Sequence, residues 1–362
     1  MKIKKLTAIF TMILLATISG CSTNESDLQF YDADIIRNSL KPNCCYYDSC
    51  FYALSDDMKG IIEYDVKSKT VTRAVEFSKY DDIDSDSIPP FFSVIPSGFI
   101  ALSYNGAKGY EYYDGDEIKD TAPLYSTVHY LNFKGDEVAK YDIIKGTINE
   151  DMSTETDSLF SCFDRGYIYG CYNNTSLMRI DPLTGKREVL GDGTDILGIC
   201  KDGIVAIDHT TDELTLYDRD DITKTQKMSY LKDENSNIGT NELFPNGTVI
   251  YETVVTDETA MTSKVTGLYY FRFGEQPKEI PQLSLIADEI SMIMSLSDSW
   301  YYVKDDVLYA IPSGVEESIK IADNVKWENI CAYNDDYILF NKTDTSADIC
   351  VVADGSIIHI GE

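Results

Sequence analysis

The sequence predicts an all-β fold, a seven-bladed β-propeller built from four-stranded antiparallel blades. Two observations lead to this prediction. A tight turn between two apolar, aromatic-rich arms recurs seven times along the chain, and a second hairpin of a different kind follows each copy. The 335 residues from Leu28 to Glu362, divided among seven units, allow about 48 residues for each, which is typical of a propeller blade.

The seven first hairpins share turns rich in Asp, Asn, Ser, Pro and Gly, between arms of β-branched and aromatic residues. They read YYDSCFYAL (46–54), VIPSGFIAL (94–102), CFDRGYIYG (162–170), CKDGIVAI (200–207), LFPNGTVIY (243–251), LSDSWYYV (296–303) and AYNDDYILF (332–340). Cysteines stand shortly before several of these turns, where other copies carry Val, Leu or Met. We therefore expect Cys45, Cys162, Cys200 and Cys331 to be buried in the apolar core.

The seven second hairpins complete four strands, A to D, in each unit. They lie at 60–75, 128–143, 176–190, 213–228, 267–280, 306–321 and 347–360. A radial ring of such sheets buries both faces of each sheet against its neighbours, whereas an open sheet of so many strands is physically unreasonable. Six or eight blades remain as alternative counts.

The long connections are all expected on one face of the disc. In a propeller, the A-to-B and C-to-D turns emerge on one face, and the B-to-C and D-to-A connections emerge on the other, which we call the loop face. The long segments are all of the second kind: 77–90, 105–127, 144–158, 231–241 and 256–264. Because binding residues are often carried by loops on a rigid scaffold, we expect the loop face to bind a partner or ligand.

Tyrosines in these long segments are the predicted contact residues, because a phenol ring offers a large surface for a sugar ring or a protein at low entropic cost. They are Tyr80, Tyr110, Tyr112, Tyr113 and Tyr125. The alternative is a solvated acidic surface that binds no ligand.

The phrase IDPLTGK at 180–186 resembles the turn that joins the outer strands of quinoprotein-like and YncE-like propellers. This resemblance implies a propeller fold for most of the chain, although the motif itself occurs in one blade. It implies no quinone cofactor, since the regular tryptophan of quinoprotein blades is missing: the chain has only Trp300 and Trp327.

The N-terminus has the pattern of a targeting segment. Lys2, Lys4 and Lys5 precede an apolar stretch that is shorter than the roughly 20 residues of a membrane-spanning helix. The sequence ISGC that ends at Cys21 resembles the lipobox of bacterial lipoproteins. The resemblance implies a signal peptide at 1–20, a lipid on Cys21 with a tether at 21–27, and an extracytoplasmic, membrane-anchored propeller at 28–362.

The charge excludes one class of partner. Sixty-one acidic and 31 basic residues give a formal charge of −30, so phosphate backbones would be repelled and nucleic acid is not expected as a partner. Cations, basic proteins and neutral glycans are compatible with this surface. We expect the membrane to be contacted through the lipid on Cys21, and an envelope protein or glycan to be the partner.

Two short motifs leave alternatives open. CCYYDSC contains Cys44, Cys45 and Cys50, and a disulfide within it is an alternative to buried thiols. The segment DDIDSDS contains carboxylates at alternate positions, the spacing that Ca²⁺ uses, but it lacks the turn glycine and the bidentate glutamate of a calcium loop. These carboxylates are Asp82, Asp84 and Asp86. Calcium is the one metal that the sequence suggests, and no other cofactor is expected.

Catalytic signatures are missing from the sequence. It contains no Gly-x-Ser-x-Gly, P-loop or His-Glu-x-x-His motif, and its three histidines, His129, His209 and His359, fall in different units. The sequence therefore favours a non-enzymatic binding or scaffold module. The alternative is a glycan-active enzyme on the same face, since a carboxylate pair can come from any two blades.

Overall fold

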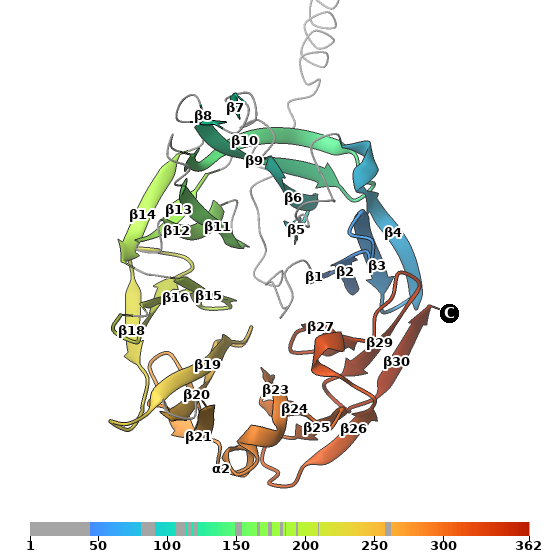
Figure 1. The fold of residues 1–362 in the computed structure, drawn as a ribbon. Coiled ribbons are helices and arrows are strands. Elements are labelled where there is room, and N and C mark those ends of the chain that lie inside the picture. The colour runs from blue at the N-terminus through green and yellow to red at the C-terminus, as the bar shows by residue number, and fades with distance from the viewer. Residues whose placement is uncertain are drawn as a thin grey trace, which may run out of the picture.

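The computed structural model contains seven four-stranded antiparallel blades around a common axis (Figure 1). It describes residues 44–80, 91–105, 113–114, 117–118, 122–148, 154–164, 167–172, 176–181, 184, 186–192, 195–208, 210–257 and 262–361. The predicted signal peptide and Cys21 lie outside these residues. No helix of the described chain is long and apolar enough to cross a membrane.

Each blade contains its strands in chain order, from the axis outward. Blade 1 contains β1 (Cys44–Tyr47), β2 (Cys50–Leu54), β3 (Gly60–Asp65) and β4 (Thr70–Glu76). Blade 2 contains β5 (Phe91–Ile95), β6 (Gly98–Asn105), β9 (Ala122–Asn132) and β10 (Glu137–Ile148). Blade 3 contains β11 (Thr154–Asp164), β12 (Tyr167–Tyr172), β13 (Ser176–Ile180) and β14 (Arg187–Asp192). Blade 4 contains β15 (Asp195–Cys200), β16 (Gly203–Asp208), β17 (Glu213–Asp218) and β18 (Thr225–Ser229).

The remaining blades follow the same plan. Blade 5 contains β19 (Asn237–Leu243), β20 (Thr248–Asp257), β21 (Thr262–Arg272) and β22 (Lys278–Glu279). Blade 6 contains β23 (Ile290–Leu296), β24 (Ser299–Lys304), β25 (Val307–Ile311) and β26 (Ile319–Asp323). Blade 7 contains β27 (Ile330–Tyr333), β28 (Tyr337–Phe340), β29 (Ser346–Val351) and β30 (Ile357–Gly361). The predicted count of seven is confirmed.

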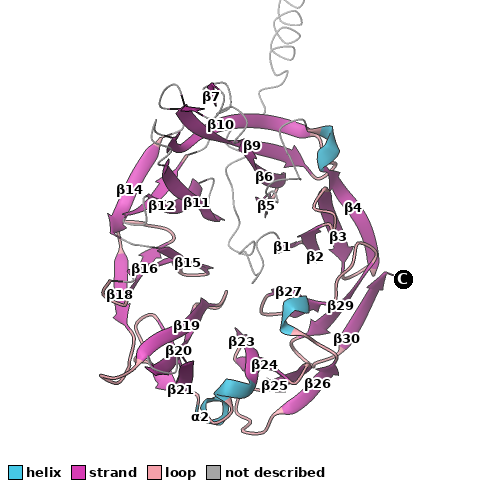
Figure 2. Ribbon diagram, in the orientation of Figure 1, coloured by secondary structure: helices cyan, strands magenta, loops and turns pink. Residues whose placement is uncertain are grey.

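Single-turn helices lie in the D-to-A connections (Figure 2). They are η2 (Phe77–Lys79), α2 (Pro281–Ser284), η4 (Ala287–Glu289) and η5 (Trp327–Asn329). A two-stranded hairpin, β7 (Tyr113–Asp114) and β8 (Glu117–Ile118), lies in the B-to-C connection of blade 2.

Four segments predicted as long loops are partly strand, which is a correction. Segment 231–241 contains the start of β19, and segment 256–264 contains the end of β20 and the start of β21. Segment 144–158 contains the end of β10 and the start of β11, and Gly146 to Ile148 pair with Thr154 to Thr156, so blades 2 and 3 form one continuous sheet. In segment 105–127, β9 begins at Ala122 and pairs with both β6 and β10. Backbone groups at the ends of long antiparallel strands are satisfied by continued pairing, and composition alone did not reveal it.

The repeated turn glycine is explained by a close approach between strands. Gly98 and Gly203 occupy the same position after the A-to-B turn, with φ of 148° and 154°. A Cβ atom there would lie 1.9 Å from the carbonyl oxygen of Leu131 or Tyr217 in the facing C strand. Only glycine fits both the dihedral angle and the space.

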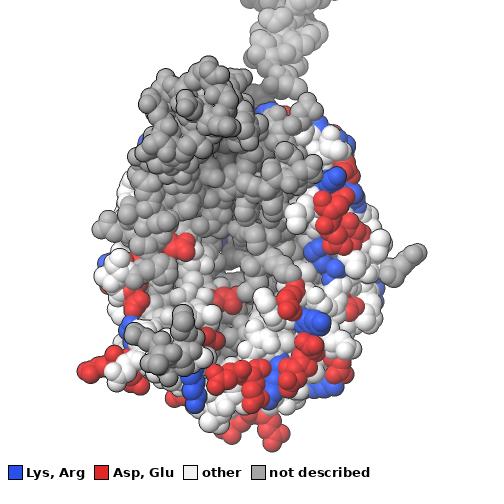
Figure 3. Space-filling model, in the orientation of Figure 1, with Lys and Arg blue, Asp and Glu red and all other residues white. Residues whose placement is uncertain are grey.

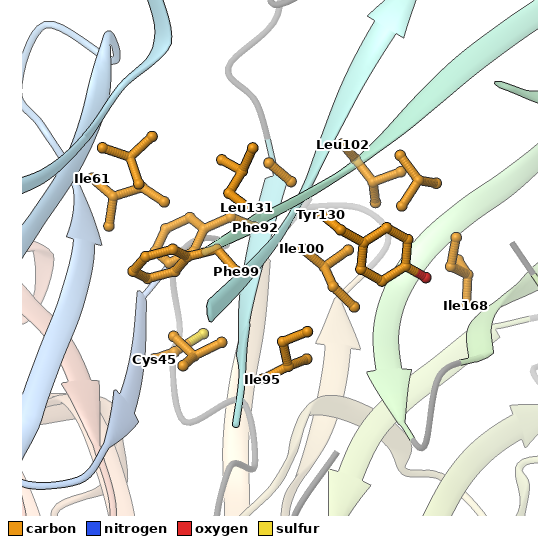
Figure 4. Close-up of a cluster of buried hydrophobic side chains, with 14 of the residues drawn as sticks. Cys45, Ile61, Phe92, Ile95, Phe99, Ile100, Leu102, Tyr130, Leu131 and Ile168 are labelled. Carbon is orange, nitrogen blue, oxygen red and sulfur yellow. The ribbon is translucent and has the colours of Figure 1, made fainter. Parts of the chain in front are cut away.

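Apolar side chains fill the seams between blades. The cluster in Figure 4 joins Cys45 and Ile61 of blade 1 to Phe99 and Tyr130 of blade 2 and Ile168 of blade 3. The prediction of buried cysteines is confirmed for Cys45, Cys200 and Cys331, which are 5% exposed or less; the side chain of Cys162 lies outside the description. In the β1–β2 hairpin, the residues opposite Cys44, Cys45 and Cys50 are Ala53, Tyr52 and Tyr47, so none of the three cysteines faces another across the hairpin.

Candidate functional site

The structure describes only part of the predicted tyrosine set. Tyr110 and Tyr112 lie outside the described residues, as do Asp82, Asp84 and Asp86 of the predicted calcium segment. Tyr113 lies in β7, and Tyr125 lies in β9, where its backbone pairs with Asn105 and Ile144. The side chains of these two tyrosines are not described.

Tyr80 makes contacts within the protein. Its hydroxyl donates a hydrogen bond to the carbonyl oxygen of Gly135 in the C-to-D turn of blade 2. Its ring lies 5.9 Å from the ring of His129, and burial raises the pKa of its phenol. The side chain therefore helps to close the seam between blades 1 and 2.

The described loop face carries its own candidate contact surface around blade 6. We call this surface the blade 6 rim. It consists of the exposed side chains in three segments: the connection from β22 to β23, the turn between β24 and β25, and the connection from β26 to β27. These residues are Pro281, Gln282, Leu285, Asp288, Glu289, Asp305, Asp306, Asn324, Lys326, Trp327 and Glu328. Figure 3 shows acidic side chains gathered over this blade and over blade 1, with lysines and arginines between them.

Two large apolar side chains project from this acidic rim. Leu285, directly after α2, is 87% exposed, the highest value among the exposed large hydrophobic residues of the described chain. Trp327, the first residue of η5, is 47% exposed. Isolated exposed apolar residues are ordinary, but these two stand in the connections that enter and leave the same blade.

Both connections are held firmly by contacts beneath them. Leu283 is buried, and the Ser284 hydroxyl accepts a hydrogen bond from the amide of Leu268 at 3.0 Å. The Asn329 side chain donates to the side-chain oxygen of Asn341 at 3.0 Å. The two exposed side chains are thus presented on an ordered backbone, which limits the entropy lost when a partner binds.

A polar pair lies close to the propeller axis, and its tyrosine, Tyr333, is buried whereas its carboxylate, Glu242, is half-buried. The hydroxyl of Tyr333 on β27 donates a short hydrogen bond to Glu242 on β19, and the rings of Tyr333 and Phe244 are 5.7 Å apart. This contact joins blades 7 and 5 past the inner edge of blade 6. Burial raises the pKa of the Glu242 carboxyl to about 7, although the bond from Tyr333 lowers it.

This raised pKa predicts a pH dependence of stability. The carboxyl holds its proton more tightly in the folded protein than at its ordinary value of 4.5, so its contribution to stability is fully present below about pH 4.5 and is lost as the pH rises through about 7. Glu242→Gln keeps a neutral hydrogen-bonding group. We expect the stability of the wild type relative to this variant to fall between these two pH values in urea denaturation, and a constant difference would contradict the burial of the carboxyl.

The described histidines and thiols do not form a nucleophilic site. His129 is buried beside Glu137 and His359 is exposed beside Asp348, in blades 2 and 7. His209 lies outside the described residues. Burial raises the pKa of the thiols of Cys50 and Cys350 to about 12, which disfavours the reactive thiolate. Within the described ranges, no group of three or more His, Cys, Asp or Glu side chains is arranged to hold a metal ion.

The opposite face, which carries the A-to-B and C-to-D turns, contains clefts that the sequence did not indicate. A cleft of about 850 Å³ lies between blades 4 and 5, beside Lys201, Arg219 and Phe273. A second, of about 270 Å³, lies between blades 3 and 4. Arg219 borders both clefts, and its guanidinium bonds the carboxylate of Asp164 at 2.7 Å, with both side chains buried.

A third cleft on this face, of about 250 Å³, lies between blades 5 and 6. Two aromatic side chains, Tyr270 and Trp300, line it together with polar and charged groups of both blades. No sequence motif marked these clefts, because the residues that line each of them come from two different repeat units.

No known protein family and no curated protein matches the chain by sequence. Among solved structures, it is similar to the tricorn protease (TM-score 0.47, 10% identity, 91% of this chain and 34% of that chain). It is also similar to an oligogalacturonate lyase in complex with manganese (TM-score 0.37, 11% identity, 75% and 84%) and to Porphyromonas gingivalis dipeptidyl peptidase 4 (TM-score 0.41, 10% identity, 90% and 60%). The chain spans about a third of the tricorn protease chain. These likenesses concern the propeller fold and assign no activity, and the quinoprotein-like resemblance of residues 180–186 stays a prediction.

Proposed function

We propose that this protein is a non-enzymatic binding or scaffold module that uses its loop face, held outside the cytoplasm by a lipid on Cys21. The observation that carries the proposal is the blade 6 rim, where the exposed Leu285 and Trp327 stand among carboxylates. Fold alone assigns no function to a propeller, whereas this surface and the loop-face connections offer groups that a partner can contact.

The chemistry of the rim selects the kind of partner. Carboxylates of Asp288, Asp305, Asp306 and Glu328 repel anions and attract lysine or arginine side chains. Exposed apolar groups on a rigid backbone suit burial at the centre of an interface, within a polar border. A basic protein segment that also carries apolar residues meets both requirements.

The two apolar side chains should matter more than any single carboxylate. We expect Leu285→Ser/Trp327→Ser to weaken capture of the envelope partner at least tenfold. Charges at the solvated edge of an interface contribute little to affinity, whereas apolar groups buried at its centre contribute most. The measurement is affinity capture from envelope extract by the full chain at two salt concentrations. Unchanged capture by this variant would contradict the proposal.

Val315→Ser is the matched control. The exposed fraction of Val315, 46%, is similar to that of Trp327, but Val315 lies in the C-to-D turn of blade 6 on the opposite face. This change should leave capture unaltered. A chain in which residues 105–127 are replaced by a short Gly/Ser turn separately tests the tyrosine-bearing segment, and turnover of an envelope polysaccharide by the wild type would favour the glycan-active alternative.

A further inference from the structure

The cleft between blades 5 and 6 lies on the face opposite the proposed contact surface. It occupies about 250 Å³, slightly below the size range of common small-molecule sites. Blade 5 contributes Tyr270 from its C strand and charged residues around its C-to-D turn. Blade 6 contributes Trp300 from its B strand and residues of its A-to-B turn.

The two aromatic side chains of this cleft, Tyr270 and Trp300, each carry a polar group that can form a hydrogen bond. The rings of Tyr270 and Trp300 meet edge to face, with centroids 4.9 Å apart and planes at 70°. Both side chains are half-buried. Among the described residues, neither the Tyr270 hydroxyl nor the Trp300 indole N–H has a protein hydrogen-bond partner, although such groups usually find one when they are buried.

The charges around the rings are paired within the cleft. Arg272 donates from Nε to the Thr248 hydroxyl at 3.1 Å, and its Nη2 lies 3.6 Å from the carboxylate of Asp298. Lys278 bonds the Glu275 carboxylate at 2.9 Å. Two cations and two carboxylates therefore balance, and the site presents hydrogen-bond donors and acceptors without a net charge.

Contacts beneath the cleft fix its shape. The Asn246 side-chain amide donates to the carbonyl oxygens of Ser295 and Ser297 at 3.3 and 3.1 Å, which locks the A-to-B turns of blades 5 and 6 together. The Ser297 amide in turn donates to the Asp335 carboxylate of blade 7 at 2.6 Å. A cleft held in this way is largely preformed, which lowers the cost of binding.

We propose that this cleft binds a ring of a neutral saccharide. A sugar ring has an apolar face of C–H groups that packs on an aromatic side chain, and hydroxyls that each donate and accept hydrogen bonds. Trp300 and Tyr270 meet the first need. The two balanced pairs, Arg272 with Asp298 and Lys278 with Glu275, meet the second. An anionic sugar is disfavoured, because the chain carries a formal charge of −30 and the cleft has no unbalanced cation to offset it.

Tryptophan fluorescence tests this proposal directly. The chain has two tryptophans, so Trp327→Phe in the full chain leaves Trp300 as the only one. This variant is titrated with cello-, xylo-, malto-, laminari-, manno- and chito-oligosaccharides at millimolar concentrations, with an oligogalacturonate as the charged comparison. We expect a saturable shift of the emission with at least one neutral sugar and none with the charged one.

Two conservative changes locate the binding. Tyr270→Phe removes a hydroxyl, and Asp298→Asn replaces a carboxylate oxygen, which accepts hydrogen bonds, by an amide NH2, which donates them. Each change, made in the Trp327→Phe chain, should weaken binding about fivefold to tenfold. Asp354→Asn, an equivalent loss of an exposed carboxylate in the C-to-D turn of blade 7, is the control and should change nothing. Asp298 is exposed, so its replacement should leave the unfolding midpoint unaltered.

Lack of response to every neutral sugar would overturn the proposal, and so would sugar binding that survives both substitutions. Neither result bears on the loop face, because the cleft and the blade 6 rim lie on opposite faces. Conversely, loss of partner capture by the Leu285→Ser/Trp327→Ser chain says nothing about the cleft.

Discussion

Phe51→Ala is expected to lower the free energy of unfolding by about 3 to 5 kcal/mol, because it leaves a cavity in a fully buried seam. Phe51 is 0% exposed and packs in the cluster that joins blade 1 to blade 7, with Leu339 and Ile349 of the last blade. The change should also raise hydrogen exchange in β28 and β29. Denaturant unfolding and exchange mass spectrometry measure the two effects.

The ring closes between its first and last blades without a shared strand in the described chain. Blades 1 and 7 each take all four described strands from one continuous stretch, so closure depends on packing and a few hydrogen bonds. The Tyr64 hydroxyl donates to the carbonyl oxygen of Thr343 at 2.6 Å, and the Lys342 ammonium donates to the carbonyl oxygen of Leu54 at 3.1 Å. A cavity at this seam should therefore open the ring there first.

Phe99→Ala is the matched control for this prediction. Phe99 occupies the same position of the repeat in blade 2 and is also 0% exposed, so its loss should cost a similar amount. It packs at the seam of blades 1 and 2 and does not belong to the cluster that joins blade 1 to blade 7. Equal hydrogen exchange in β28 and β29 for both variants would contradict the prediction that the ring opens first at the seam of blades 1 and 7.

Asp164→Ala is expected to destabilise the protein by about 3 to 5 kcal/mol. The change takes away the carboxylate that Arg219 bonds at 2.7 Å, and the guanidinium side chain is only 5% exposed. Removing one member of a buried ion pair weakens the compensation of the other charge in a region of low polarity. The shift of the denaturation midpoint, at an unchanged slope, measures the loss.

Two comparisons separate this effect from a general loss of charge. Asp221→Ala removes a carboxylate whose side chain is 42% exposed in the C-to-D turn of blade 4 and should change stability much less. Asp164→Leu/Arg219→Met replaces the pair by apolar groups and should recover most of the loss. If Asp164→Ala lowers the free energy of unfolding no more than Asp221→Ala does, the prediction that the Asp164–Arg219 ion pair stabilises the protein is wrong.

The sequence predicted the blades because each blade is a local structure. Turn residues such as those around Gly98 and Gly203 recur along the chain, and each hairpin forms between residues that are close in sequence. Strand ends were predicted less well, because continued pairing, as between β10 and β11, depends on the partner strand rather than on composition.

The candidate sites were harder to predict because their residues are far apart in the chain. Tyr270 and Trp300 come from different blades, and Asp164 and Arg219 are separated by 55 residues. Nothing in a repeat pattern indicates which side chains meet across a seam. Leu285 also lay outside the predicted loops, because its connection follows the very short strand β22 (Lys278–Glu279).

The most direct test of the central claim is a hydrogen-exchange footprint of the full chain with its captured envelope partner. We expect protection in the connections that contain Leu285 and Trp327 and in the turn at Asp305 and Asp306, with no change at the A-to-B and C-to-D turns. Protection confined to those turns would contradict the proposal that the loop face is the contact surface.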